Sequence, residues 1–249
     1  MRVFSGLRVK LMGCFRRAGA GPTAVLLLSY LTPCLEAKEP KLKPEEVIAR
    51  HLEALGSPEA RAAISSRTAT GNAQVKILVG GSGEMLGAAG FVSQQRKLCL
   101  FLQFNHPDYE REQVAFDSDK PQVGVARAAA RSPLGQFLHT YNQVLREGLL
   151  GGAVSTAWPL LDLEHRQPKL SYAGLEKVDD QSLHQLKYSL KKGGGDLKIS
   201  LYFEPETGHH LLSVYKVTIA AGAGLVHTES AGQQETRFTL EEKLKDRVG

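Results

Sequence analysis

Eight histidines are the side chains of this sequence best suited to bind a metal or to transfer a proton. No two of them have the His-Glu-x-x-His or His-x-His spacing of a metal site, and no pair of cysteines stands at ligand spacing. His209 and His210 are adjacent in a predicted hairpin turn beside Glu204 and Glu206. Because neighbouring residues of a strand point to opposite faces, we expect these two imidazoles to lie on the surface and to share no ion.

Three further motifs lack the frame that catalysis or phosphate binding needs. Ser82 stands in Gly-Gly-Ser-Gly instead of the Gly-x-Ser-x-Gly of a nucleophile elbow. The glycines at 193–195 lead into a strand pattern, whereas a phosphate-binding loop leads into a helix. Asp179 and Asp180 lie in a predicted turn, where aspartate serves the backbone conformation. We therefore expect no catalytic residue, no metal and no cofactor, and we expect that the chain is not an enzyme.

The net charge of +5 is concentrated at the N-terminus. Residues 1–37 hold five arginines and lysines against one acidic residue, Glu36, and the rest of the chain has 26 basic and 25 acidic residues. A nucleic-acid-binding surface needs a basic excess on one face. The nearly neutral body therefore predicts no nucleic-acid partner.

The first 37 residues have the layout of a secretory signal peptide. A basic stretch ends at Arg17, an apolar run follows at 18–31, and Ala37 supplies a small residue at a cleavage point. The run has about 14 residues, whereas a membrane-spanning helix needs about 20. We expect the signal peptide 1–37 to be removed, which leaves one periplasmic domain at 38–249 with peripheral or no stable membrane insertion.

Other interpretations of this leader stay open. The apolar run could remain as an uncleaved anchor, and Arg16-Arg17 is half of a twin-arginine signal that lacks the usual bulky apolar pair. Cys34 could be lipidated, although Pro33 stands where a small residue is expected. The true start of translation could be Met12.

Two helices are predicted from apolar residues at i, i+3, i+4 and i+7 spacing. The first covers 44–55 and ends before Gly56. The second begins at the Ser132-Pro133 pair, which suits a helix start, and continues to Gly148.

Alternation of apolar and polar residues predicts strands at 72–79, 97–104 and 197–204. Cys99, in the second of these, is expected to be a small buried apolar side chain. Short turns such as 192–196 join neighbouring strands as hairpins, which requires antiparallel pairing. The whole pattern predicts an α+β fold built on an antiparallel sheet of roughly eight to ten strands.

Short motifs are spread over most of the body, at 51–56, 131–135, 146–152, 155–159, 170–178 and 201–208. Together they resemble bacterial proteins of the outer-membrane lipoprotein-sorting type, which are distant relatives of the lipoprotein carrier LolA. The resemblance implies a sheet curved into a half-barrel with helices packed in its concave side, around an apolar cavity for acyl chains. It also implies a binding or carrier protein for lipid or lipoprotein acyl chains in the bacterial cell envelope.

The apolar strand faces are expected to line this cavity, with aromatic residues of the second helix as a roof and Trp158 near the rim. The candidates are Val75, Ile77, Leu98, Leu100, Leu102, Phe137, Tyr141, Trp158, Ile199, Leu201 and Phe203. The same faces would also suit a closed core under the helices. In that case the chain would be a non-catalytic envelope sensor or scaffold that binds another protein.

The related chains continue beyond the strand at 237–242 with further strands, whereas this sequence stops at Gly249. We therefore expect a domain that lacks its last C-terminal strands and that exposes a strand edge at 236–240. Because unpaired edges recruit other strands, dimers or aggregates of the chain are expected.

Cleavage of the leader can be tested on protein extracted from the cell envelope. N-terminal sequencing should start at Lys38 or at a neighbouring residue, because the apolar run is too short to span a membrane. A sequence that begins before Ala24 would contradict cleavage.

Overall fold

The structure is a computed structural model that describes residues 4–10, 42–77, 83–107, 109–124, 131–191, 195–220 and 234–243. Ser82, Cys14, Cys34 and the expected cleavage point at Ala37 lie outside these residues. Within them, no helix is long and apolar enough to cross a membrane.

Six strands form the first sheet, in the spatial order β1-β2-β3-β4-β5-β6. Their bounds are β1 (Phe4–Lys10), β2 (Ser66–Ile77), β3 (Gly83–Gln94), β4 (Lys97–Phe104), β5 (Arg111–Asp117) and β6 (Lys120–Val123). Each strand from β2 to β6 pairs antiparallel with the next, whereas β1 pairs parallel with β2. The meander arises from short turns, which connect only antiparallel neighbours.

Five strands form the second sheet, in the order β11-β10-β9-β8-β7. Their bounds are β7 (Lys169–Val178), β8 (Gln181–Ser189), β9 (Leu197–Phe203), β10 (His210–Ala220) and β11 (Gln234–Lys243). All neighbours in this sheet pair antiparallel. The predicted turn at Asp179 and Asp180 joins β7 to β8.

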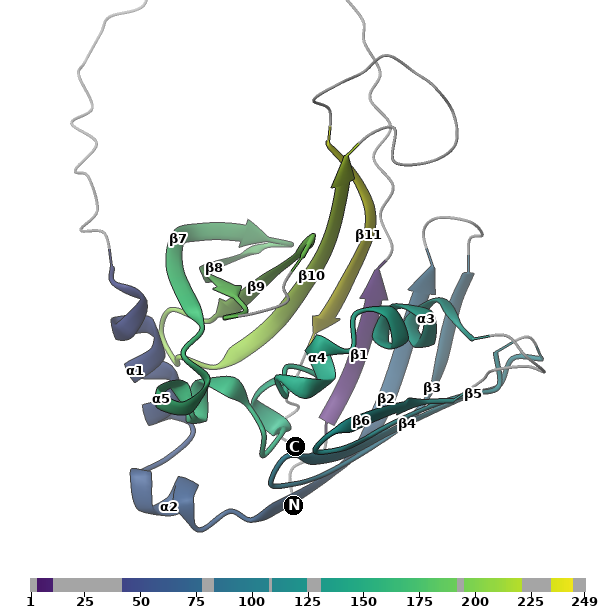
Figure 1. Cartoon of the computed structure of the whole chain (residues 1–249), viewed down its shortest axis with the longest axis horizontal. Coiled ribbons are helices and arrows are strands. Elements are labelled where there is room, and N and C mark those ends of the chain that lie inside the picture. The colour runs from purple at the N-terminus through teal and green to yellow at the C-terminus, as the bar shows by residue number, and fades with distance from the viewer. Residues whose placement is uncertain are drawn as a thin grey trace, which may run out of the picture.

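The expected α+β class with antiparallel strands is confirmed, but the strands form two sheets where one was expected. In Figure 1 the sheets face each other, and β1 lies beside β11 at the place where the two sheets approach. The strand edge expected to be exposed at 236–240 is the last strand of the second sheet, and β1 lies next to it. Curvature into one half-barrel stays a prediction.

The helices are short. Helix α1 (Pro44–Ala54) and helix α2 (Pro58–Ala62) precede β2 in the chain. Residues 131–168, here named the strap, connect the two sheets through short helices, and the first two of these helices lie between the sheets in Figure 1. The strap contains α3 (Pro133–Thr140), α4 (Gln143–Arg146), η1 (Gly152–Val154), η2 (Pro159–Leu161) and α5 (Leu163–Arg166).

The helix predicted from Ser132 to Gly148 is wrong as one element. It ends at Thr140, because Tyr141 leaves the helical region with φ −105° and ψ 51°, and α4 begins only at Gln143. The break leaves the apolar residues on both sides pointing into the core, with Phe137, Leu138, Val144 and Leu145 all buried. Apolar spacing alone does not reveal such a break, since both halves keep an inward face.

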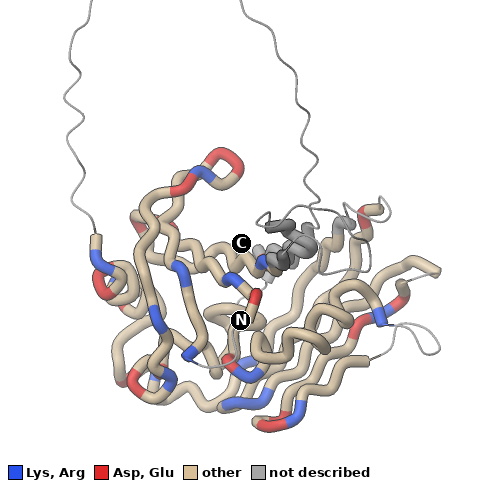
Figure 2. Tube along the Cα trace, turned by 45° about the horizontal axis from the view of Figure 1, so that its top comes forward, with Lys and Arg blue, Asp and Glu red and all other residues tan. Residues whose placement is uncertain are grey.

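Charged residues of both signs are mixed over the turns and strands that Figure 2 colours. Strand β4 alternates between buried and exposed side chains: Leu98, Leu100 and Leu102 are buried, while Lys97 and Phe101 point outward. Cys99 is half-buried on the outer side instead of fully buried, and burial raises the pKa of its thiol. The charge distribution agrees with the balanced composition of the body.

Gly148 permits the strap to turn back on itself. Its φ is +70°, and a Cβ atom there would lie 2.2 Å from the carbonyl oxygen of Ala157. The substitution Gly148→Ala should therefore lower the free energy of unfolding by roughly 2 kcal/mol or more in urea titrations. Gly90→Ala is the matched control, because a Cβ at Gly90 meets no atom within 4 Å. Equal stability of the two variants would contradict this role of Gly148 in the turn.

Candidate binding site

The cavity candidates converge from both sheets and from the strap into one hydrophobic core. Leu98, Leu100 and Leu102 come from β4, and Ile199 and Leu201 come from β9. These five are between 0% and 6% exposed and belong to one continuous cluster. The same cluster contains Val75, Phe137, Trp158 and Phe203, and Tyr141 packs against it half-buried. Ile77 lies in β2, and its side chain is outside the described residues.

The strap is the layer that joins the two apolar faces. The ring of Phe137 lies 5.2 Å from that of Tyr141 and 6.2 Å from that of Tyr215 in β10. On the other side, Phe91 of β3 packs against Gly151, where an added Cβ would lie 2.6 Å from the ring. The strap therefore packs against the first and the second sheet through aromatic contacts.

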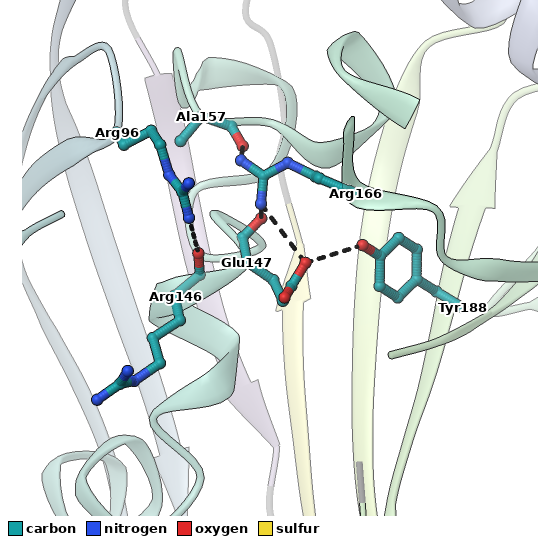
Figure 3. A network of polar contacts seen from close by, with 6 residues as sticks. All are labelled: Arg96, Arg146, Glu147, Ala157, Arg166 and Tyr188. Atoms are coloured by element: carbon teal, nitrogen blue, oxygen red, sulfur yellow. Dashed lines mark hydrogen bonds and ion pairs between the residues drawn. The ribbon is translucent and has the colours of Figure 1, made fainter. Parts of the chain in front are cut away.

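Polar contacts hold the second half of the strap (Figure 3). The guanidinium of Arg166 donates to the carbonyl oxygens of Glu147 and Ala157 at 2.7 and 3.0 Å, and it lies 3.5 Å from the Glu147 carboxylate. Tyr188 of β8 donates to the same carboxylate at 3.3 Å. Arg96, in the turn between β3 and β4, donates to a strap carbonyl at 3.3 Å. This network connects the strap to both sheets.

Trp158 is fully buried and donates a hydrogen bond to helix α1. Its indole Nε1 lies 2.9 Å from Nε2 of His51, and Nδ1 of His51 lies 3.0 Å from the carbonyl oxygen of Gly208. Because Nε2 accepts the indole proton, Nδ1 carries the imidazole proton and donates to Gly208. Burial lowers the pKa of His51 to about 4, so the ring is neutral at physiological pH.

The position expected for Trp158 near a cavity rim is therefore wrong. A rim residue is partly exposed, whereas Trp158 is 0% exposed and its ring lies 4.7 Å from the ring of His210. The sequence motif around Trp158 carried no sign of the histidine partner, which is 107 residues away in the chain.

The expected surface position of His210 is also wrong. His209 is exposed as expected, but His210 is 5% exposed, since alternate residues at the start of β10 point inward. Its Nε2 lies 3.1 Å from the hydroxyl of Ser213, and its Nδ1 has no hydrogen-bond partner among the described residues. Burial lowers the pKa of His210 to about 3.

Two buried carboxylates fix other parts of the site, and the sequence motifs pointed to neither. Glu242 of β11 accepts a hydrogen bond from the backbone N–H of Gly151 at 2.7 Å, and Tyr215 donates to it at 3.4 Å. Burial raises the pKa of Glu242 to about 7. Because the unfolded carboxyl loses its proton near pH 4.5, this residue makes the fold less stable as the pH rises from 4.5 to 7.

Glu112 anchors the start of α3 to the first sheet. Tyr109 donates to its carboxylate at 2.6 Å, and the Ser132 hydroxyl donates to the same oxygen. The Ser132 oxygen in turn accepts the N–H of Gly135 at 2.8 Å, which confirms the predicted helix start. Burial raises the pKa of Glu112. The alternation of β5 places Glu112 on the inward face of the strand. This alternation is the sequence signal from which the burial of Glu112 could have been predicted.

The interior polar groups do not form a metal centre. Among the described residues, no three histidine, cysteine, aspartate or glutamate side chains come together in a metal-binding arrangement. The buried carboxylates of Glu112 and Glu242 and the imidazoles of His51 and His210 contact backbone groups, hydroxyls or an indole instead. Their arrangement can hold segments in place.

No protein-family model and no curated protein matches this chain. Among solved structures, it is similar to an outer membrane lipoprotein-sorting protein domain from Vibrio parahaemolyticus, at 10% identity over 82% of this chain and 94% of that one, with a TM-score of 0.36. It is also similar to a LolA superfamily protein from Nitrosomonas europaea, at 10% identity over 84% and 95%, with a TM-score of 0.35. A third is the lipoprotein LppX from Mycobacterium tuberculosis, at 12% identity over 81% and 94%, with a TM-score of 0.30.

At these identities no residue role is transferred to this chain. The function is therefore inferred from the contacts within the chain itself.

The buried imidazoles predict a loss of stability in acid. In the unfolded chain, His51 and His210 each take up a proton near pH 6.5. In the folded chain, His51 does so only near pH 4 and His210 only near pH 3. Each should therefore lower the free energy of unfolding by about 1.4 kcal/mol per pH unit as the pH falls from 6.5 towards 4. Glu242 makes the free energy of unfolding change with pH in the opposite direction. The parent alone therefore does not separate the two effects, and the test compares histidine variants with it.

His210→Gln cannot take up this proton, so its stability should fall less steeply between pH 6.5 and about 4.5 than that of the parent. His165→Gln is the control for replacement of a histidine at the surface, since His165 is exposed. Urea titrations over this pH range measure these slopes. A His210→Gln slope equal to that of the parent would refute the buried neutral imidazole.

Proposed function

We propose that this chain is a non-catalytic binding protein of the bacterial periplasm that holds an acyl chain between its two sheets. The observation that supports the proposal is the large continuous apolar cluster to which both sheets and the strap contribute. Residues from β4 and β9, far apart in the chain, meet there with Phe137 of the strap. An acyl chain requires such a continuous apolar lining and no charge.

The energy of transfer favours such a cargo. Burying one methylene is worth about 0.8 kcal/mol, so a chain of roughly sixteen carbons gains on the order of 10 kcal/mol before ordering costs. This gain has to exceed the cost of displacing the side chains that fill the space between the sheets. The cost is lowest where the displaced element is short and weakly tied.

Helix α3 is the element best suited to move. It has eight residues, fewer than an isolated helix needs for stability in water, so its position depends on packing. Its polar tie is the Ser132–Glu112 contact at its first turn, and Phe137 and Leu138 form its buried face. The second half of the strap is held by Arg166, Trp158 and Glu242 and is expected to stay in place. Movement of α3 alone would open the core beside Phe137 and Tyr141.

The polar residues of the interior support binding over catalysis. Glu112, Glu242, His51 and His210 each sit against a helix start, a turn or a neighbouring ring that they hold in place. His51 and His210 approach each other, with ring centroids 6.3 Å apart, and both rings pack against the buried rings of Trp158 and Phe203. These four residues therefore belong to the scaffold of the binding site.

A fluorescent fatty-acyl probe such as parinaric acid tests the proposal on the parent chain and on Leu100→Trp. The added indole fills space between the sheets without adding charge, so probe binding should weaken by about tenfold or more. Two controls separate this effect from general damage. Phe101→Trp changes the exposed face of the same strand, and Leu212→Trp overfills a separate cluster of buried residues.

Both controls should bind the probe as the parent does, while Leu100→Trp and Leu212→Trp should lose similar amounts of stability. Absence of probe binding to the parent would show a closed core and would favour a scaffold that binds another protein. Equal weakening in Leu100→Trp and Leu212→Trp would show that the loss comes from destabilisation alone.

A further inference from the structure

The two sheets leave room for one strand at the place where they approach. Strand β2 ends the antiparallel part of the first sheet, and β11 ends the second sheet. Strand β1 lies between them, paired with β2 on one side and beside β11 on the other (Figure 1). Among the described strands, the pair β1–β2 alone is parallel, and its partners are 67 or 66 residues apart in the chain.

The register of β1 against β2 shows which residue types fit beside β2. Phe4 is opposite Gly71, Leu7 is opposite Ala73, and Val9 is opposite Val75. Ala73 and Val75 are buried on the inner face of β2, and the residues between them alternate to the outer face. The small residues Gly71 and Ala73 of β2 are thus paired with Phe4 and Leu7 of the incoming strand, and Val75 is paired with Val9. The alternate positions pair 5, 8 and 10 of β1 with 72, 74 and 76 of β2, and all six of these residues are polar or charged.

The far wall of this position is held in place. Glu242 near the end of β11 accepts the N–H of Gly151, and Tyr215 of β10 donates to the same carboxylate. The pairing of β10 with β11 runs from Leu212 to Ala220. The gap between β2 and β11 is therefore bounded by two strands with fixed positions, and we name it the strand slot.

The strand that fills the slot lies in the segment predicted to be removed as a signal peptide. Removal of residues 1–37 would leave the backbone N–H and C=O groups along 71–76 of β2 without their β1 partners. Such an edge is a ready template for another strand.

We propose that the strand slot is a protein-binding site that β1 fills in the uncleaved chain and that, after cleavage, takes an extended segment of a partner protein. The partner segment runs parallel to β2 over about six residues and carries apolar side chains at every second position. Main-chain hydrogen bonds supply affinity, and the small residues Gly71 and Ala73 select large apolar side chains. The proposal is independent of acyl-chain binding, which concerns the core between the sheets.

A peptide with the sequence of residues 3–11 serves as the probe, and the full chain is used throughout. In the parent, β1 competes from the same molecule at an effective concentration on the order of millimolar, so the peptide should bind weakly. In Val9→Pro, β1 loses a backbone N–H and the fit of its ladder, which opens the slot. Peptide binding should therefore be stronger in Val9→Pro than in the parent by at least about 100-fold.

Hydrogen–deuterium exchange locates the peptide. Amides of 71–76 in β2 should gain protection in Val9→Pro with the peptide, and a scrambled peptide that lacks the alternation should give none. The double variant Leu7→Asn, Val9→Asn opens the slot by a second route and checks that proline itself has not disturbed the fold. An alternating valine–lysine peptide should also bind the opened chain, because binding in the strand slot requires alternating apolar and polar residues and no particular sequence.

Several outcomes would overturn the proposal. These are equal affinity of parent and opened chains, equal binding of the scrambled peptide, and protection outside β2 and β11. Dimers of the opened chains that exclude the peptide would show that a second copy is the occupant, and would also overturn it. Loss of acyl-probe binding does not bear on this result, since that assay reports on Leu100 and the core.

Discussion

The hydrogen bond from the Trp158 indole to His51 is the contact on which the arrangement of the strap depends. A buried indole N–H without an acceptor costs about 1–3 kcal/mol, so the strap turn at 155–158 and helix α1 have to meet. His51 also holds the turn before β10 in place, because its other ring nitrogen donates to the carbonyl oxygen of Gly208. Two residues before Trp158, Thr156 bonds to Ser93 of β3. One short segment of the strap is thereby tied to α1 and to both sheets.

This constraint divides the interior into a fixed part and a part that can open. The indole N–H of Trp158, the terminal guanidinium nitrogens of Arg166 and the carboxylate of Glu242 are paired inside an apolar surround, where loss of one partner leaves the other unsatisfied. Around α3, contacts are mostly apolar, and such contacts can be exchanged for those of a cargo at little net cost. The acyl-chain account depends on this difference between the two halves of the strap.

Local patterns predicted the strands well, because alternation needs no knowledge of distant partners. The segments 97–104 and 197–204 correspond to β4 and β9 almost residue for residue, and Ser132 caps a helix as expected. The break at Tyr141 was missed because the apolar spacing continues across it. The burial of His210 and Glu242 was missed because Trp158 and Gly151, which they contact, lie far away in the chain. The cavity candidates with described side chains lie in or against one core, whereas the division into two sheets depends on which strand edges meet.

The most direct test of acyl-chain binding between the sheets locates the cargo by nuclear magnetic resonance. A spin-labelled fatty acid is added to the full chain with isotope-labelled leucine methyl groups, and the loss of each methyl signal is measured. The account predicts that Leu100 of β4 and Leu201 of β9 lose their signals first, while Leu183 and Leu212 of the separate cluster keep theirs. Uniform loss over all these leucines, or loss confined to Leu183 and Leu212, would contradict binding between the sheets.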